Sequence, residues 1–315
     1  MQRYIIRRIL ASLPIFFVVT ASAFFLMQWT GADAAVAMAG PEASAEQIDR
    51  LRAEYGLDRP VVVRYAEWLA GAAQGDLGRS VSLARDPVTD RLIARAPVTV
   101  QLAVIALAVS LSIAIPVGVL SALRRNSAWD YAASLVALMG VSIPGFALGF
   151  LALYIFAVQL QWLPVGGYVH IWEDPGRNLK VMILPGIVLG MELAGIVTRL
   201  TRSTMLEVLR EDYIRTARAK GLANRVVVVR HALRNALLPI LTVVGIQIGI
   251  LIGGSFIIEV VFSLPGMGRL LVDAINARDI FVIQGVLLVV TATFIVVNLL
   301  VDVSYAIVDP RIRYG

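Results

Sequence analysis

Residues 98–123 read VTVQLAVIALAVSLSIAIPVGVLSAL, an uninterrupted run of 26 residues without a charged side chain. About 20 apolar residues in a helix cross the ~30 Å hydrocarbon core of a bilayer. Because the hydrocarbon offers no partner to a backbone N–H or C=O, a helix is the simplest way for such a run to satisfy its own backbone. The run therefore predicts a membrane-spanning helix, which we place at residues 98–121.

Five further stretches have the same character, and together they predict an all-α polytopic membrane protein with six transmembrane helices. The fourth span is the shortest and contains Glu192, so it is the least secure of the six. The uncharged part of the first span exceeds the 7–15 residues of a signal-peptide core, which favours a retained anchor helix. The five other expected spans are residues 9–29, 131–158, 181–198, 237–260 and 280–303.

The composition excludes several classes of protein. Hydrophobic residues make up 58% of the 315 residues and charged residues only 16%, against roughly 25% charged residues in soluble domains. A soluble enzyme, a disordered chain and a free nucleic-acid binder are therefore excluded, despite a net charge of +6. The chain has no cysteine, so it can form no disulfide and no thiolate metal site.

The distribution of charge predicts the orientation. With the N-terminus inside, the inner segments hold 16 basic and 5 acidic residues, and the outer segments hold 12 basic and 14 acidic residues. Cytoplasmic loops carry the excess of Lys and Arg. Both termini are thus expected in the cytoplasm, in a multi-pass protein of the bacterial inner membrane. The basic excess is expected to reflect topology and contact with lipid, not nucleic-acid binding.

The outer segment, residues 30–97, is predicted to be helical and periplasmic. Ser44 and Gln47 have the spacing of a capping box, and Gly56 can end that helix. A second helix over residues 61–73 and a third beginning at Asp86-Pro87 are expected to follow. Two interpretations stay open: a small helical cap packed on the outer mouth, or a docking platform or gate for a delivered ligand.

The inner segment, residues 199–235, holds nine basic residues and two possible short helices. Asp212 can begin a helix running to Lys220, and Gly221 follows where a left-handed cap residue belongs. Asn224 can then cap a second helix running to Arg234. Such a loop could simply lie on anionic lipid headgroups, but two capped helices favour a knob presented to a cytoplasmic partner.

This segment carries a family resemblance. Thr216-Ala217-x-x-x-Gly221 resembles the Ala-Ala-x-x-x-Gly core of the EAA loop of ABC importer permeases. Two departures, Arg215 at the Glu position and a proline displaced to Pro239, are common in the branch for dipeptides, oligopeptides and nickel. Further stretches resemble the B-type subunit of that branch: EDYIRTARAKGL (211–222), RHALRNALLP (230–239), LRAEYGLDRP (51–60), GDLGRS (75–80), LPVGGY (163–168), VVFSLPGMGRLLVDAI (260–275) and DPRIRY (309–314).

The resemblance implies partners and a mode of action. The expected partners are a second homologous permease in a heterodimer, two cytoplasmic ABC ATPase subunits or domains, and a periplasmic or lipoprotein substrate-binding protein. The substrates implied are di- or oligopeptides, with nickel chelates, glutathione, opines and some sugars left open. In that family the short helix of the loop seats in a groove of the ATPase. Carried over, the ATPase-coupling residues are Asp212, Arg215, Thr216, Ala217, Arg218, Ala219, Lys220, Gly221 and Leu222.

The chain itself is expected to be a non-catalytic subunit. A phosphate-binding loop requires lysine followed by Ser or Thr, whereas Lys180 precedes Val181 and Lys220 precedes Gly221. No cofactor is expected in this chain, and ATP and Mg are expected in the partner ATPase. His170 and His231 lie in no metal-ligand spacing, so no metal site is predicted.

The spans carry two kinds of candidate residue. Glycines recur every four residues, which lets helices approach closely and predicts helix packing at Gly186, Gly190, Gly245, Gly249 and Gly253. Pro116, Pro144 and Pro185 can each kink a span.

An acidic group inside a span costs roughly 2.5–3.5 kcal/mol on insertion scales. Glu192 is therefore expected to line the translocation path or to meet a buried partner, and Gln247 is a weaker candidate for the path. As an alternative function, Glu192, Glu259 and Asp302 could serve a secondary transporter or channel as an ion relay.

Overall fold

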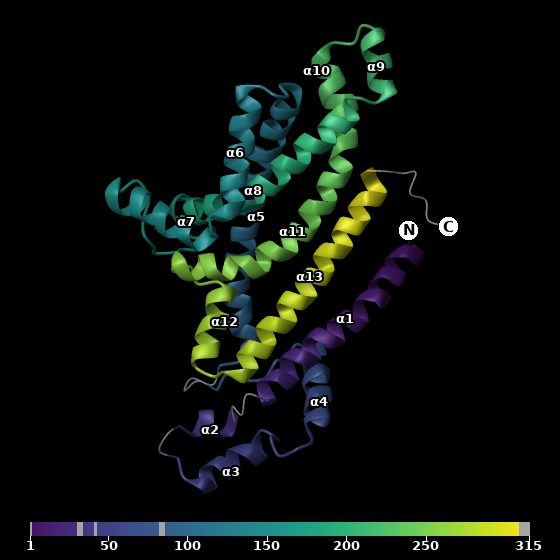
Figure 1. Ribbon diagram of the computed structural model, residues 1–315. Coiled ribbons are helices and arrows are strands. Elements are labelled where there is room, and N and C mark those ends of the chain that lie inside the picture. The colour runs from purple at the N-terminus through teal and green to yellow at the C-terminus, as the bar shows by residue number, and fades with distance from the viewer. Residues whose placement is uncertain (1, 30–33, 41–42, 82–85, 309–315) are drawn as a thin grey trace. The chain divides into compact units, whose positions relative to one another are not determined.

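A computed structural model describes residues 2–29, 34–40, 43–81 and 86–308 of the protein (Figure 1). The described residues are nearly all helical, and the only pairing of extended backbone among them is an isolated bridge between Arg79 and Pro87. The chain divides into two compact units. Unit 1 comprises Met1–Thr99 and Pro265–Val296, and unit 2 comprises Val100–Leu264 and Val297–Gly315.

Among the described residues, five helices are long and apolar enough to cross a membrane, and a bent pair raises the number of possible spans to six. The five lie in α1 (Gln2–Trp29), α5 (Val88–Leu123), α8 (Pro175–Val208), α10 to α11 (Asn224–Val226 and Arg234–Val261) and α13 (Ile280–Val308). The bent pair joins α6 (Ala128–Ser142) to α7 (Gly145–Ala152) and η1 (Leu153–Gln159). The predicted all-α membrane fold is confirmed.

Unit 1 contains the helices expected between the first two spans. α3 (Ala45–Glu54) begins with the predicted capping box, in which Gln47 N–H donates to Ser44 Oγ at 3.3 Å and Ser44 N–H donates to Gln47 Oε1 at 3.0 Å. Gly56 follows the helix with a φ of +60°, the conformation for which glycine is suited. α2 (Ala34–Ala39) precedes α3, and α4 (Val61–Ala73) coincides with the predicted second helix.

Aromatic packing fastens α4 to α1. The ring of Phe24 lies 5.4 Å from that of Tyr65 and 5.9 Å from that of Trp68, and the hydroxyls of Thr20 and Tyr65 are 2.8 Å apart. Aromatic pairs at such distances contribute about 0.5–1.5 kcal/mol beyond the area they bury. These contacts support the interpretation of residues 61–73 as a cap packed against the first span.

The expected third short helix is wrong as a separate element, because α5 runs without a break from Val88 to Leu123. A helix can extend beyond the bilayer core, so the start of an apolar run does not mark the start of its helix. In unit 1, α12 (Met267–Asn276) joins the start of α5 through a bond from Met267 N–H to Thr99 Oγ1 at 2.9 Å.

Unit 2 is built around α8, which packs against α6, α7 and α11. α6 and α8 run antiparallel: a Cβ on Gly140 would lie 3.1 Å from Met191 O, and one on Gly195 would lie 2.5 Å from Ala137 O. α8 is also the most enclosed of the candidate spans, with 72% of its apolar window buried. The span that looked least secure is therefore the core of its unit.

The third span is not one straight helix. It turns by 101° between α6 and α7, where Ile143 has an extended backbone before Pro144. A residue before proline is driven out of the helical region by contact with the proline ring, which explains the position of the break. Pro116 and Pro185, by contrast, lie inside unbroken helices.

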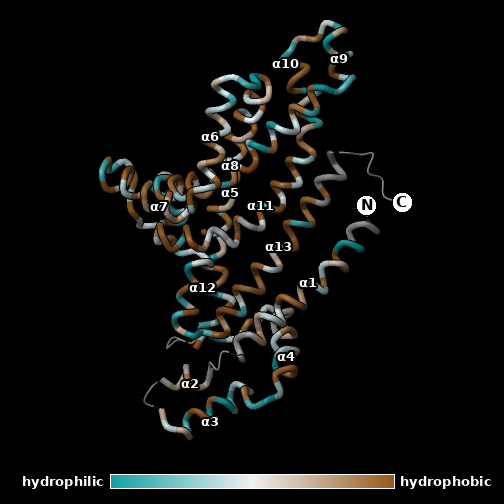
Figure 2. The backbone as a smooth tube through the Cα atoms, in the orientation of Figure 1, coloured by the Kyte–Doolittle hydropathy of each residue, from teal (hydrophilic) through white to brown (hydrophobic). Residues whose placement is uncertain are grey.

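Hydropathy follows this architecture (Figure 2). α6 and α11 are coloured largely as hydrophobic, whereas α9 (Asp212–Ala219) mixes both kinds of residue. Many large apolar side chains are exposed, among them Leu135 on α6, Phe150 on α7 and Leu300 on α13. Exposure of this kind is expected of a chain that faces lipid or a partner subunit.

Candidate functional site

The inner segment begins with helix, not with a loop. α8 continues to Val208, ten residues beyond the predicted end of the fourth span, and only the residues numbered 209–211 separate it from α9. Asp212 lies in the first turn of α9 and Arg218 in the last, so the charges complement the helix dipole. Figure 1 shows α9 lying beside α10 (Asn224–Val226) within unit 2.

Gly221 ends α9 in the left-handed conformation, as predicted. Its φ is +78°, its N–H donates to Arg218 O at 2.9 Å, and Leu222 N–H donates to Ala217 O at 3.4 Å. These two bonds form a Schellman cap. No heavy atom of the described residues lies within 4 Å of a Cβ added at Gly221, so within this part of the chain the backbone conformation, and not the space, requires glycine.

Two apolar residues fasten α9 to its own chain. Ile214 is fully buried and Ala217 is 6% exposed, and their i, i+3 spacing places them on one face. They belong to a hydrophobic cluster, here called the anchor cluster, whose buried members come from α5, α8, α9, the π-helix η2 (Val227–Leu233) and α11. Its members are Ala122, Met205, Ile214, Ala217, Val227, Val228, Ala232 and Ala236.

Ala217 packs against residues of its own chain in the anchor cluster, a contact that the sequence did not indicate. The resemblance places Ala217 among the ATPase-coupling residues, yet its methyl group packs inside this chain. Burial of a side chain the size of Ile214 stabilises by about 1.5–3 kcal/mol. α9 is therefore held by two apolar contacts and presents its remaining surface outward.

Among the charged residues on the outward surface of α9 and its C-cap, three are basic and one is acidic. Arg215 lies 3.4 Å from Asp212, but their side chains are 75% and 92% exposed, so this pair contributes less than about 1 kcal/mol. Thr216 Oγ1 donates to Asp212 O at 3.0 Å. The exposed candidates are Asp212, Arg215, Thr216, Arg218, Ala219, Lys220, Gly221 and Leu222.

Tyr213 is a residue of this site that the sequence did not single out. Its hydroxyl accepts a hydrogen bond of 2.9 Å from Asn235 Nδ2, near the start of α11. Asn235 also donates to His231 O at 2.8 Å. No local signal could have paired Tyr213 with Asn235, because the pair is 22 positions apart and is brought together only by the turn after α9.

The predicted cap at Asn224 is wrong. Ala223 is the N-cap residue, Asn224 is already the first residue of α10, and no side chain caps the helix. α10 passes through η2 directly into α11, so the expected end at Arg234 does not exist. The helix continues past Arg234, because the valines and alanines on both sides of that residue form an apolar face that packs in the anchor cluster.

An ion pair lies close to the anchor cluster in unit 2. Arg202 Nε and Nη2 donate to Asp130 Oδ1 at 2.6 Å and Oδ2 at 2.8 Å. Asp130 also accepts from Asn126 N–H at 2.9 Å and from the hydroxyl of Ser121. Its side chain is only 3% exposed. Four donors thus satisfy one buried carboxylate and join the α5–α6 turn to α8.

The predicted packing glycines divide into two groups. A Cβ on Gly190 would lie 2.6 Å from Ala106 O, and Cβ atoms on Gly186 and Gly245 would overlap Ile105 and Val301. These three sites let helices of unit 2 approach closely. Gly253 differs, because no heavy atom of the described residues lies within 4 Å of its Cβ position. Gly249 lies in α11 and is half-buried.

The two candidates for the translocation path occupy different environments. Glu192 is exposed, and a Cβ on Gly145, the first residue of α7, would lie 3.4 Å from its Oε2. The carboxylate thus lies at the break between α6 and α7. Gln247 is buried within α11 at 9% exposure. Of the acidic residues of the alternative relay, Glu259 is buried, and the side chain of Asp302 lies outside the described residues.

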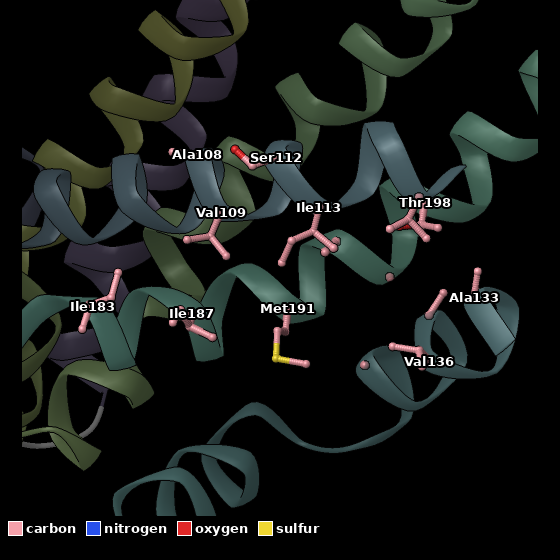
Figure 3. A pocket seen from close by; sticks show the side chains of 15 residues that line it. Ala108, Val109, Ser112, Ile113, Ala133, Val136, Ile183, Ile187, Met191 and Thr198 are labelled. Carbon is pink, nitrogen blue, oxygen red and sulfur yellow. The ribbon is translucent and has the colours of Figure 1, made fainter. Parts of the chain in front are cut away.

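A cavity of about 520 Å³ lies between α5, α6 and α8 of unit 2. Val109 and Ile113 point from α5 toward α8, and Val136 comes from α6 (Figure 3). Ser112 and Thr198 are the only hydroxyl-bearing residues of its lining, which holds no charged side chain. An apolar cavity of this size suits an apolar occupant.

The sequence identifies the family. Residues 114–314 match the binding-protein-dependent transport system inner membrane component, and residues 1–103 match the N-terminal domain of the same kind of membrane component. A protein of Brucella abortus named as a peptide transport system permease is 44% identical over 314 residues and covers 100% of both chains. The chain belongs to the family of binding-protein-dependent inner-membrane transport components.

Further relatives agree with this family. The glutathione transport system permease protein GsiC of Escherichia coli O6:H1 is 40% identical over 314 residues, with complete coverage of both chains. A chain of the MetNI methionine ABC transporter in an inward-facing conformation has the same fold, with a TM-score of 0.58 at 19% identity. That match covers 70% of this chain and 96% of the other.

This permease is thus a multi-pass inner-membrane subunit of an ABC importer. Family membership implies an ATPase and a substrate-binding protein as partners. Because the chain is a subunit of an ABC importer, we set aside the alternative function of a gradient-driven secondary transporter or channel.

Proposed function

We propose that α9 is the ATPase-coupling helix of this permease and that it faces the cytoplasm together with both chain termini. The observation that carries the proposal is the division of α9 into two faces. Ile214 and Ala217 are buried in the anchor cluster, whereas Arg215, Arg218 and Lys220 are exposed. A helix that packs on its own chain through one face and exposes basic residues on the other can bind a partner and transmit the movement of that partner to the chain.

The anchor cluster supplies the route of transmission. Because Met205 of α8 and Ala236 of α11 pack with Ile214, a displacement of α9 acts on both helices at once. ATP shifts the permease between inward- and outward-facing states only if the ATPase binds α9 differently in the two states. ATP and Mg are bound by the partner, and this chain contributes no phosphate-binding loop.

We infer a second permease as the partner across the membrane, in a heterodimer with two ATPase subunits or domains. A Cβ built on Gly253 would meet no heavy atom of the described residues within 4 Å, and the 520 Å³ cavity is apolar. Both features are consistent with helices that a second permease completes. Within the path that the pair encloses, the exposed carboxylate of Glu192 is the stronger candidate, since Gln247 is buried in its own chain.

We infer di- or oligopeptides, or glutathione, as substrates, delivered by a periplasmic or lipoprotein binding protein. The inference follows the names of relatives that match the full chain at 40–44% identity. Uptake of labelled dipeptide, longer peptide and glutathione should be compared in proteoliposomes that hold the complete importer, with and without ATP. Uptake that requires both ATP and the binding protein is expected, whereas gradient-driven uptake by this chain alone would contradict the proposal.

The coupling assignment is tested by reversing charge on the exposed face. The double variant Arg215→Glu and Arg218→Glu should insert normally, because neither residue packs in the anchor cluster, but should co-purify with much less ATPase. Arg124→Glu, an exposed arginine in the α5–α6 turn, is the matched control. Equal recovery of the ATPase with both variants would overturn the assignment.

A further inference from the structure

We propose that a groove between α6 and α8 of unit 2 is a binding site for an anionic phospholipid. The groove has a volume of about 670 Å³ and is separate from the apolar cavity between α5, α6 and α8. Its lining comes from two antiparallel helices. From α6 come Ser134, Leu138 and Val141, and from α8 come Ile196, Arg199, Leu200, Arg202 and Ser203.

The lining is amphipathic along its length. On α8, Ile196, Leu200 and Ser203 follow one helical stripe that changes from apolar to polar toward the C-terminus. On α6, Ser134 and Val141 show the same change in the opposite chain direction. Because the helices are antiparallel, the hydroxyls and arginines gather at one end, together with Leu200, and Leu138, Val141 and Ile196 lie toward the other. A phospholipid likewise has a polar headgroup at one end and apolar acyl chains at the other.

Arg199 is the cation that can pair with a phosphate. Nε and Nη2 of Arg202 already bind Asp130. Arg199 is exposed and forms no hydrogen bond or ion pair with any residue that the structure describes. It directly follows the predicted end of the fourth span at residue 198, which is the level at which a headgroup is expected. Basic pockets between spans bind anionic headgroups in this way.

Two other occupants fit the groove less well. A helix of the second permease would cover Leu138 and Val141 but would also bury Arg199, and an unpaired buried charge is strongly unfavourable. A free phosphate would pair with Arg199 but would leave the apolar half uncovered. A phospholipid satisfies both ends, because its phosphate meets Arg199 near Ser203 and one acyl chain lies along Leu138, Val141 and Ile196.

The site can be tested by native mass spectrometry of the assembled importer titrated with phosphatidylglycerol or phosphatidylcholine. Arg199→Gln should weaken phosphatidylglycerol binding about fivefold, the effect of about 1 kcal/mol per basic residue near a membrane surface. Arg199→Lys keeps the positive charge and should bind phosphatidylglycerol as the native permease does. Arg125→Gln, which removes an exposed arginine from the α5–α6 turn, should change binding by less than about twofold.

A second pair of variants tests the acyl-chain part without changing charge. Val141→Trp fills the groove and should weaken binding as much as Arg199→Gln, whereas Leu135→Trp, at an exposed position of α6 outside the groove, should not. Equal effects of Arg199→Gln and Arg125→Gln would overturn the proposal in favour of diffuse attraction. Cross-linking of Leu138→Cys to the second permease in the assembled importer would overturn it in favour of a protein interface.

Discussion

Asp130 and Arg202, which lie 72 positions apart in the sequence, form a two-point ion pair between the start of α6 and α8. Arg202 lies three residues before Met205, a fully buried member of the anchor cluster. The pair therefore fixes the α5–α6 turn to the part of α8 against which α9 packs. If α9 is the coupling helix, as proposed, a movement of α9 acts on helices that this ion pair holds together.

Removal of Arg202 should destabilise this permease. Arg202→Gln leaves the Asp130 carboxylate buried with two of its four donors, and we expect a loss of about 2–4 kcal/mol. The loss stays near or below that for a fully buried pair because the Arg202 side chain is 29% exposed. Thermal unfolding in detergent should show a lower Tm for Arg202→Gln than for Arg210→Gln, at an exposed arginine. Identical melting of the two variants would show that the ion pair contributes nothing.

Truncation of Ile214 should loosen α9, the proposed coupling helix, without unfolding the spans. Ile214→Ala removes a fully buried side chain from the anchor cluster, at a cost of about 2–5 kcal/mol for a large-to-small core change. Hydrogen exchange at the amides numbered 212–219 should become faster, and ATP-driven uptake should fall. Val226→Ala, an apolar truncation at an exposed position of α10, is the control. Unchanged exchange in Ile214→Ala would mean that the anchor cluster does not hold α9.

Substitution of Gly221 should act through the backbone alone. At a φ of +78°, alanine costs roughly 1–2 kcal/mol, whereas asparagine tolerates this conformation better. Gly221→Ala should therefore reduce recovery of the ATPase with the permease, and Gly221→Asn should reduce it less. A Cβ at Gly221 meets no heavy atom of the described residues within 4 Å, so a clash within this chain does not account for the loss. Lower recovery of the ATPase with Gly221→Asn than with Gly221→Ala would contradict the role of the Schellman cap.

Substitutions of the packing glycines should differ in whether their effect appears in the isolated chain or only in the heterodimer. Gly190→Ala would place a methyl group 2.6 Å from Ala106 O, so we expect a loss of about 1–3 kcal/mol even in the isolated chain. Gly253→Ala should leave the isolated chain unchanged. If the second permease covers Gly253, the alanine variant should weaken only the heterodimer. Size-exclusion chromatography with Tm measurements on the chain and on the complex would distinguish these results.

Local signals were sufficient for much of the fold. The Ser44–Gln47 box, the left-handed conformations of Gly56 and Gly221, and α4 were all predictable, because each depends on residues that are neighbours in sequence. Long apolar runs likewise located the helices of the spans, although not their ends. α5 and α8 extend beyond their apolar runs because a helix does not end at the bilayer surface.

Features that depend on distant residues could not be predicted in this way. The Asp130–Arg202 pair and the Tyr213–Asn235 bond join different helices. Asn224 resembles a cap, but the apolar face after it continues the helix into α11. The sequence indicated that Pro144 could kink its span, yet the 101° turn depends on how α7 packs against α8 and α11.

The most direct test of the account uses the absence of cysteine from the chain. Arg218→Cys on α9 and Arg124→Cys in the α5–α6 turn each introduce a single thiol at an exposed position. Maleimide labelling from the cytoplasmic side should modify both thiols in the permease expressed without its ATPase. In the assembled importer, Arg218→Cys should be protected and Arg124→Cys should remain reactive. Equal labelling of both thiols in the assembled importer would contradict the role of α9 as the ATPase-coupling helix.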